Sequence, residues 1–430
     1  MFDRFLKILS NNKKNIILYC VTILVSVGLL IAGNKITYDK TSMFQGGYED
    51  GASRATVTEI VSLDRVDNII DGVNIGQDIT VVFKALIKSG QYKGQTVTAY
   101  ESIAATDADA LKEVTIGDKV LLTMVPEEAE SDVGYDWHLH AFDRSLPLVI
   151  LLSLFLALVL IFGRKKGINT AVSLSFTVAA VFLVFLPSVL SGGNIYLWSI
   201  LTCVYIIAMS LLINEGYSKK TLAAVIGCTS GVVVAGVLSV IMSHFLNLNG
   251  ITGSDMLQLK WNFESIDLKG VIFAGIILGA VGAVKDVAVS ISSSLKELHE
   301  QVENPTFGGL VKSGMNIGRD IMGTMADTLV LAYIGCELST TLLQVVYSSS
   351  LSTLFSLEKI VVDVLQALVG SIGILLAIPL TALVSAALYV GLPKTKLKVK
   401  SKEQKFDKYY VEPSNEPSLY ESLESREDEK

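Results

Sequence analysis

The chain has 430 residues, of which 51% are hydrophobic and only 18% are charged. Soluble globular proteins carry roughly a quarter charged residues, so this composition excludes an ordinary soluble domain. The formal net charge of −7 argues against a basic surface for nucleic acid, and no nucleic-acid partner is expected. All cysteines lie in apolar runs without a Cys-x-x-Cys pair, so we expect neither a disulfide framework nor a metal site: Cys20, Cys203, Cys228 and Cys336.

The first apolar run, Ile16 to Gly33, follows a basic segment that includes Lys13 and Lys14. This pattern fits either a cleaved signal peptide or an uncleaved anchor. The run has about 18 residues, which is longer than a usual signal core. The residues Ile31-Ala32-Gly33 are also a poor cleavage site. We therefore favour a cytoplasmic N-terminus and a signal-anchor helix over residues 1–37.

Residues 38–143 have a different pattern. Apolar and polar residues alternate at 55–66, 78–88, 96–103 and 115–125, and turn signals such as Ser89-Gly90 and Gly117-Asp118 separate these segments. Four or five short strands predict a small all-β barrel or sandwich. Acidic residues outnumber basic ones here, and no cysteine is present, so the domain would fold without disulfides.

Residues 144–392 contain seven more apolar runs of membrane-spanning length. Together with the first run they predict a polytopic α-helical membrane protein with about eight transmembrane helices and a β domain between helices 1 and 2. The seven runs lie at 146–163, 168–190, 195–213, 221–246, 270–291, 317–336 and 361–391.

Basic residues follow alternate spans, at 164–166, 219–220, 296–312 and 394–402. The positive-inside rule then places both termini in the cytoplasm and the β domain outside the cell. We also expect a cytoplasmic amphipathic helix at 292–312, a re-entrant or interfacial segment at 340–356, and a disordered cytoplasmic tail at 393–430.

The sixth span carries a stripe of small and polar residues. Gly275, Gly279, Gly282 and Asp286 fall on one helical face, and Ser290 continues it. Glycines spaced four apart mark close helix packing in membranes. Asp286 is therefore expected to face a neighbouring helix or a cavity.

The seventh span has a similar face, which contains Asp320, Gly323, Thr324 and Asp327. Asp327 would lie about 15 Å into the span if the helix begins near Ile317. An acid at such a depth costs roughly 2.5 kcal/mol or more on insertion scales, and such residues usually line a pathway or pair internally.

Two interpretations of these acids remain open, and they can coexist. In one, crossed ion pairs join the two spans, Lys285 with Asp320 and Arg319 with Asp286. In the other, the acids line a route for an ion or substrate. Both interpretations expect the glycine faces of the two spans to pack together, with Gly275, Gly279, Gly282 and Gly323 in the contact.

The motifs of these spans resemble the YibE/F family of bacterial multi-spanning membrane proteins. The resemblance rests on Gly279-Ala-Val-Gly-Ala-Val-Lys-Asp286-Val-Ala-Val-Ser290-Ile and on Gly318-Arg-Asp320-Ile-Met-Gly323-Thr-Met-Ala-Asp327, and it extends to Ser89-Gly-Gln-Tyr-Lys-Gly94. Asp327 stands where the family pattern more often has Asn, and either side chain can coordinate a cation. The resemblance implies a multi-pass protein of a bacterial cell membrane, and it implies architecture more than activity.

Two functions remain for this architecture. The first is a transporter or permease for an ion or small solute, which uses Asp286, Asp320, Asp327, Thr324 and Ser290 to bind a cation or proton. The second is a non-transporting membrane component whose β domain binds a partner or envelope ligand. No nucleophile or metal constellation indicates an enzyme, and no cofactor is expected. The expected partners are the lipid bilayer and the substrate, with a second copy or another protein as an open alternative.

Overall fold

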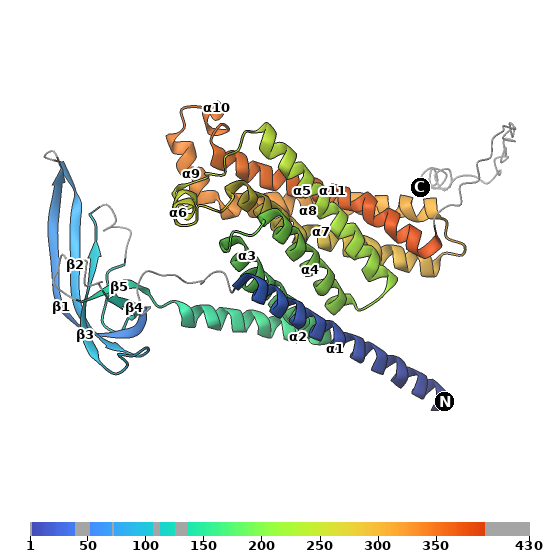
Figure 1. Ribbon diagram of the computed structural model, residues 1–430, viewed down its shortest axis with the longest axis horizontal. Helices are drawn as coiled ribbons and strands as arrows, with labels where there is room; N and C mark the ends of the chain where they lie inside the picture. The colour runs from blue at the N-terminus through green and yellow to red at the C-terminus, as the bar shows by residue number, and fades with distance from the viewer. Residues whose placement is uncertain (1, 39–51, 71–72, 106–111, 125–135, 392–430) are drawn as a thin grey trace, which may run out of the picture. The chain divides into compact units, whose positions relative to one another are not determined.

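The computed structural model describes residues 2–38, 52–70, 73–105, 112–124 and 136–391 (Figure 1). The expected tail at 393–430 lies outside these residues. The described chain contains one all-β part and one helical part, and each is presented by itself.

The β part is a closed barrel of five strands in the order β1-β2-β3-β5-β4. Neighbouring strands are antiparallel except β3 and β5, which run parallel. This arrangement has the strand order of the OB barrel, a Greek-key fold used for ligand binding. The strands are β1 (Ser53–Ile70), β2 (Val73–Ile87), β3 (Thr96–Ile103), β4 (Lys119–Met124) and β5 (Trp137–Phe142).

Period-two alternation explains the barrel core. On β2, Ile79, Val81, Phe83, Ala85 and Ile87 are buried and point to the same side of the strand. They pack with inward side chains of the other strands in one hydrophobic cluster. The expected small β-barrel between the first two helices is therefore confirmed.

The strand prediction was incomplete at β4 and β5. The segment predicted at 115–125 begins with a turn at Gly117 and pairs only from Lys119. Strand β5 lies outside the four segments that the sequence pattern predicted as strands. In the structure Trp137 is buried in the barrel core, and its ring meets Tyr92 edge to face.

The helical part begins with α1, ahead of the barrel in sequence, and continues after it to Val390. Its elements are α1 (Phe2–Tyr38), α2 (Ser145–Ala180), a π-helical turn (Val181–Phe185), α3 (Leu186–Leu190), α4 (Ile195–Glu215), α5 (Lys219–Phe245), α6 (Ser254–Asn262), α7 (Leu268–Gln301), α8 (Phe307–Cys336), α9 (Leu338–Tyr347), α10 (Leu351–Leu354) and α11 (Glu358–Val390).

Among the described residues, six helices are long and apolar enough to cross a membrane. The count becomes seven if α8 and α9, which meet at a bend of 67°, form one span. A membrane-inserted helical protein is thus supported. The difference from the expected eight spans lies in Ser145–Leu190, which forms one stretch of 46 residues.

This stretch reverses direction at Arg164, which has φ 48° and ψ −124° and breaks the helix. A Cβ added to Gly167 would collide with the carbonyl oxygen of Val159. In a straight helix these two residues would lie about 12 Å apart, because eight residues rise 1.5 Å each. The two halves of the stretch therefore fold against each other as a helical hairpin.

The expected amphipathic helix at 292–312 is wrong as a separate element. Residues up to Gln301 extend α7 without a break, because no helix breaker follows Ser290 until Asn304-Pro305. Asn304 adopts a positive φ of 57°, and α8 begins at Phe307. The segment at 340–356 contains α9 and the short α10, which begins three residues beyond Ser348.

The centre of the helical part is formed by α7 and α11, with α5 and α8 packed against them (Figure 1). Small residues let these helices approach closely. Gly231 on α5 meets Ala377 on α11, where an added Cβ would lie 2.8 Å from the Ala377 Cβ. Gly227 lies even closer to Thr381 one turn along. The close glycine packing therefore involves α11 with α5.

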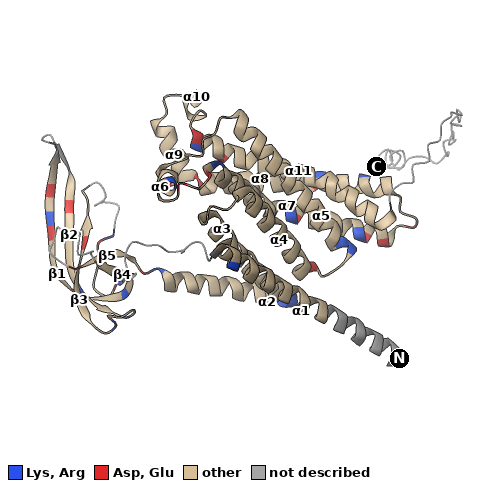
Figure 2. Cartoon of the chain, viewed as in Figure 1, with Lys and Arg blue, Asp and Glu red and all other residues tan. Residues whose placement is uncertain are grey.

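Charged residues occur on the barrel and near helix ends, whereas the long helices are mostly uncharged (Figure 2). The few charges within α7 and α8 are therefore exceptions that need a physical reason.

Candidate functional site

The small and polar stripe of α7 lies on the open side of that helix. Gly275, Gly279, Gly282, Asp286 and Ser290 are all exposed, which means that the rest of the described chain covers them only in part. The opposite side of α7 is buried in the helical core through Ile276, Ile277, Ala280, Val284, Val287, Ala288 and Ile291. Helix α7 therefore directs its apolar side toward the helical core and the Asp286 carboxylate away from it.

Two polar side chains from neighbouring helices lie against the outer half of this stripe. The Tyr333 hydroxyl of α8 is so close to Gly279 that an added Cβ would collide with it. The Gln366 amide nitrogen of α11 lies 3.2 Å from where a Cβ would stand on Gly275. Gly275 and Gly279 are one turn apart, about 6 Å along the axis, so the two polar groups follow each other along α7.

The Tyr333 hydroxyl is buried and has no hydrogen-bond partner among the described residues. Burying such a group without a partner costs about 1–3 kcal/mol. A water molecule or a passing solute could satisfy it, and the polar stripe of α7 beside it is the open side from which either would arrive.

A charged cluster lies at the bend between α8 and α9. The Lys359 ammonium pairs with Glu337 at 2.8 Å and with Asp363 at 3.4 Å, and all three side chains are largely buried. The Oδ2 atom of Asp363 is buried without a hydrogen-bond partner in the described chain. Asp363 precedes Gln366 by nearly one turn of α11, so the cluster continues the line of polar groups past Gly275.

Helix α8 packs through a different face from the one predicted. Its buried residues Gly314 and Gly318 lie against Ala382 and Ile378 of α11, and Leu329 reaches Gly370 of the same helix. Asp320, Gly323, Thr324 and Asp327 are exposed on the other side.

The expected contact between the glycine faces of α7 and α8 is therefore present only at Gly279. Among the described residues, no atom outside the backbone of the same helix lies within 4 Å of a Cβ added at Gly282 or Gly323. The reason is that Gly314, Gly318 and Leu329 form a more apolar ridge than the acidic face does, and this ridge takes the packing position against α11.

The crossed ion pairs are also absent. Within the described chain, neither Lys285 nor Arg319 lies within 4.0 Å of a carboxylate, and the closest polar contact of Arg319 is a long one of 3.5 Å to the Asn316 side chain. Asp286 and Asp320 are both exposed, and neither has its expected ion-pair partner among the described residues.

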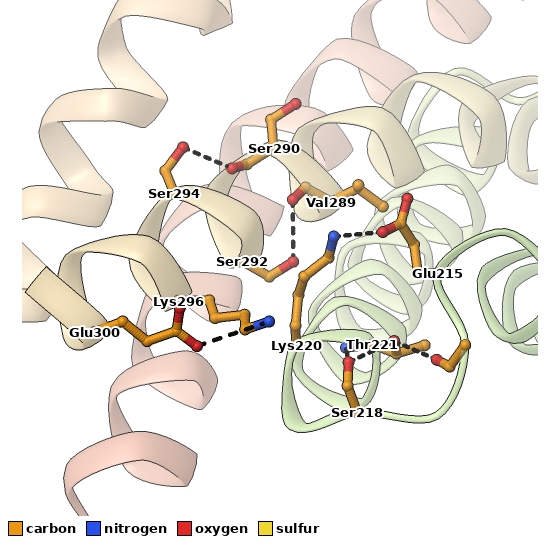
Figure 3. A network of polar contacts seen from close by, with 11 residues as sticks. Glu215, Ser218, Lys220, Thr221, Val289, Ser290, Ser292, Ser294, Lys296 and Glu300 are labelled. Carbon is orange, nitrogen blue, oxygen red and sulfur yellow. Dashed lines mark hydrogen bonds and ion pairs between the residues drawn. The ribbon is translucent and has the colours of Figure 1, made fainter. Parts of the chain in front are cut away.

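The hydroxyl groups of the site bond to their own helices. Ser290 donates to the Asp286 carbonyl oxygen at 2.8 Å. Ser294 donates to the Ser290 carbonyl oxygen at 3.0 Å (Figure 3). Thr324 donates to the Ile321 carbonyl at 3.0 Å. Each hydroxyl oxygen keeps its acceptor lone pairs, so it remains able to coordinate a cation.

Further charged residues lie at the C-terminal end of α7 and at the ends of α4 and α5. Lys220 pairs with Glu215, and Lys296 pairs with Glu300 at 3.7 Å (Figure 3). Figure 3 shows Ser290 and Ser294 on one side of α7 and Lys220 on the other. These ion pairs therefore belong to the helix ends and leave the stripe itself unpaired.

Sequence reasoning missed Tyr333, Gln366 and the Lys359 cluster. A signal was present in Asp363 and Gln366, which place an acid and an amide one turn apart in an apolar span. Nothing in the sequence tells which helix Tyr333 contacts. In the described chain no group of three His, Cys, Asp or Glu side chains is placed to hold a metal ion.

Comparison with known proteins supports the architecture. A model of the YibE/F-like protein family matches residues 151–391, which is more than half of the chain. No curated protein and no solved structure matches the chain. The matched range begins in α2, ends after α11 and includes every acid of the α7 and α8 faces. The chain is therefore a member of the YibE/F-like protein family.

Proposed function

We propose that this protein is a membrane transporter or permease for an ion or small solute, with intramembrane carboxylates as its cation or proton sites. The observation that carries the proposal is the exposure of Asp286, Asp320 and Asp327, with Ser290 and Thr324, on helices that are otherwise apolar. Within the described chain none of the three acids has an ion-pair partner. No catalytic role is proposed for them.

Energetics favours a water-lined route over contact with lipid. A charged side chain at the centre of a bilayer costs about 2.5–3.5 kcal/mol on insertion scales, and such residues generally face a cavity or a partner. An acid that exchanges a proton or cation can be neutral in one state and charged in the next. That exchange is what a transporter needs from a binding site.

The polar groups along α7 provide successive positions for a solute. Asp363 and Gln366 lie at one end, the Tyr333 hydroxyl follows beside Gly279, and Asp286 lies seven residues further, about 10 Å along the axis. Ser290 adds a hydroxyl one turn beyond. Because Gly282 between them has no side chain, this part of the stripe is open to a hydrated ion.

The proposed topology has eight spans. We count the hairpin at Arg164 as two spans and α8 with α9 as one, and add α1, α4, α5, α7 and α11. Basic residues at 164–166, 219–220 and 296–312 then share one side of the membrane with both termini. The barrel within residues 38–143 faces outward from a bacterial cell membrane, and residues 144–392 form the membrane domain.

Flux through purified protein in liposomes tests the proposal. Wild-type protein is assayed with protons, monovalent and divalent cations, amino acids and small peptides, beside Asp286→Asn and Asp327→Asn. Asp255→Asn is the control, because Asp255 is an exposed acid on α6 outside the site. We expect flux of one class of solute, lost in the two site variants and kept in the control. Flux that is equal in all four proteins would contradict the role of the acids.

A second candidate, a non-transporting component, is favoured by the long β1–β2 hairpin of the barrel. Val61, Leu63 and Val66 are 48%, 47% and 63% exposed on β1, which suits contact with a partner or envelope ligand. The two candidates differ in one outcome. A protein that acts only through its barrel moves no solute in liposomes and loses its partner when Val66→Asp is introduced.

A further inference from the structure

One face of α8 has no partner in the described chain. Asn316, Arg319, Asp320, Gly323 and Asp327 are all exposed. At about 100° per residue, Asn316, Gly323 and Asp327 fall within about 40° of one another and form a line along the helix. We call these three residues and their two charged flanks, Arg319 and Asp320, the α8 seam.

The two flanks of the α8 seam carry opposite charges at the same height. Arg319 and Asp320 lie about 50° to either side of the line, and adjacent residues differ in height by only 1.5 Å. Arg319 makes only the 3.5 Å contact to Asn316, and Asp320 has no ion-pair partner among the described residues. The face is therefore complementary to itself under a two-fold rotation.

We propose that a second copy of this chain covers the α8 seam and that the two copies form a symmetric dimer in the membrane. Copies inserted in the same orientation are related by an axis along the membrane normal, so their α8 helices run parallel and equal heights meet. Arg319 of each copy then pairs with Asp320 of the partner subunit, and the reverse pair forms at the same level. The geometry is that of flanking charges across a parallel helix pair.

Gly323 provides the close approach at the centre of this contact. Apart from the backbone of α8 itself, no atom of the described residues lies within 4 Å of a Cβ added there, so a neighbouring helix has room to pack against it. Small residues mark helix contacts in membranes because they let backbones come near each other. One turn further, Asp327 of each copy reaches the axis, where two carboxylates and the nearby Thr324 hydroxyls would share a cation or a proton.

The dimer contact stands on the charges and the open glycine, whereas its part in completing a cation site rests on the proposed function. The contact also offsets the cost of Arg319 and Asp320 in the membrane, because each charge gains a partner. Asp286 and Asp327 are then the acids that remain to bind a cation or proton. The ion pairs across the dimer contact do not require the cation site, and the cation site does not require the ion pairs. A dimer without flux would leave the contact intact and remove the proposed function.

Cysteine cross-linking in native membranes tests the contact. Cys20, Cys203, Cys228 and Cys336 are first replaced by Ala, and Gly323→Cys is then oxidised. Met322→Cys is the control, because Met322 has the same depth and is 37% exposed, yet it points about 100° away from Gly323. We expect a covalent dimer from Gly323→Cys and none from Met322→Cys. Equal yields, no dimer, or an adduct with a different protein would overturn the proposal.

Charge exchange provides the second measurement. Arg319→Asp leaves only acids on both flanks, and Asp320→Arg leaves only bases, so each single variant should lose the cross-linked dimer. The double variant, Arg319→Asp with Asp320→Arg, restores opposite charges and should recover it. A double variant that stays monomeric while its single parents are monomeric and folded would contradict the reciprocal pairing.

Discussion

The hydroxyl of Tyr333 on α8 lies directly against Gly279 on α7, where a side chain on residue 279 would collide with it. Gly282 is three residues further on the same stripe, and in the part of the chain that the structure describes no atom beyond the backbone of α7 lies within 4 Å of its Cβ position. The two glycines thus have different roles. Gly279 gives space to the tyrosine, and Gly282 keeps the stripe open.

We expect Gly279 and Gly282 to respond differently to substitution by Ala. Gly279→Ala should displace Tyr333 and destabilise the protein by about 1–3 kcal/mol, the usual cost of overpacking. Gly282→Ala should be neutral or slightly stabilising, because Ala is favoured over Gly in a helix by roughly 0.5–1 kcal/mol. Thermal unfolding in detergent measures both. Equal melting temperatures for the two variants would show that the Tyr333 contact carries no packing constraint.

The Lys359 cluster should be important for stability. Lys359→Met leaves Glu337 and Asp363 together without a cation in a site where all three side chains are largely buried. We expect a loss of about 2 kcal/mol, somewhat below the range for fully buried pairs. Lys296→Met is the matched control, because its pair with Glu300 is exposed and should be worth at most about 0.5 kcal/mol. A loss at Lys359 no larger than the control's would argue against the cluster as a structural element.

Glu101 in the barrel makes stability depend on pH. Burial raises the pKa of Glu101, and the Val114 amide, which donates to its carboxylate at 2.8 Å, opposes this only in part. The folded barrel then holds the proton more tightly than the unfolded chain. The barrel should therefore lose stability as pH rises from the unfolded pKa, about 4.3, through the raised folded pKa.

Glu101→Gln should remove this dependence, since the amide oxygen still accepts from Val114 and no charge is buried. Urea unfolding at pH 5 and pH 8, followed by Trp137 fluorescence in a background with Trp198→Phe and Trp261→Phe, compares the variant with Glu59→Gln. Glu59 is a suitable control because its pair with Lys84 is on the surface. A pH dependence that persists in Glu101→Gln would place its origin elsewhere.

The topology predicts which positions react with an impermeant maleimide added outside intact cells. Ser62→Cys on β1 should react, because the proposed topology places the barrel outside. Lys165→Cys at the α2 hairpin should react only after the membrane is opened. Both residues are in the described chain, so neither position depends on the tail. The opposite accessibility would reverse the orientation of every span.

The sequence was sufficient for the features that depend on local patterns. The alternation on β2 predicted a barrel strand, and the apolar runs predicted the helices. The stripe from Gly275 to Asp286 was also read correctly as one face, since helix geometry alone decides which residues share it. Strand β5 was missed because its burial depends on contacts with β3 and β4, which the pattern within β5 alone does not show.

Local sequence patterns could not show which neighbouring helix each face of α7 and α8 contacts. The two Asp-containing faces were expected to meet, but Gly314, Gly318 and Leu329 give α8 a better apolar ridge against α11. Which of two faces on one helix packs inward depends on the shape of the neighbouring helix, and a pattern within α8 alone does not contain that shape. The line from Asp363 through Gln366 and Tyr333 likewise appears only when three helices are assembled.

The central claim is that the open stripe of α7 faces water within the membrane. Reaction of introduced cysteines with a small charged thiol reagent tests it most directly, in a background without native cysteines and without knowledge of the substrate. Gly282→Cys and Asp286→Cys are compared with Leu154→Cys, whose native side chain is 55% exposed on α2 but belongs to an apolar surface. The account predicts modification of the two α7 positions and none at residue 154. If the α7 positions are as unreactive as residue 154, the stripe faces lipid or protein and the proposed route is contradicted.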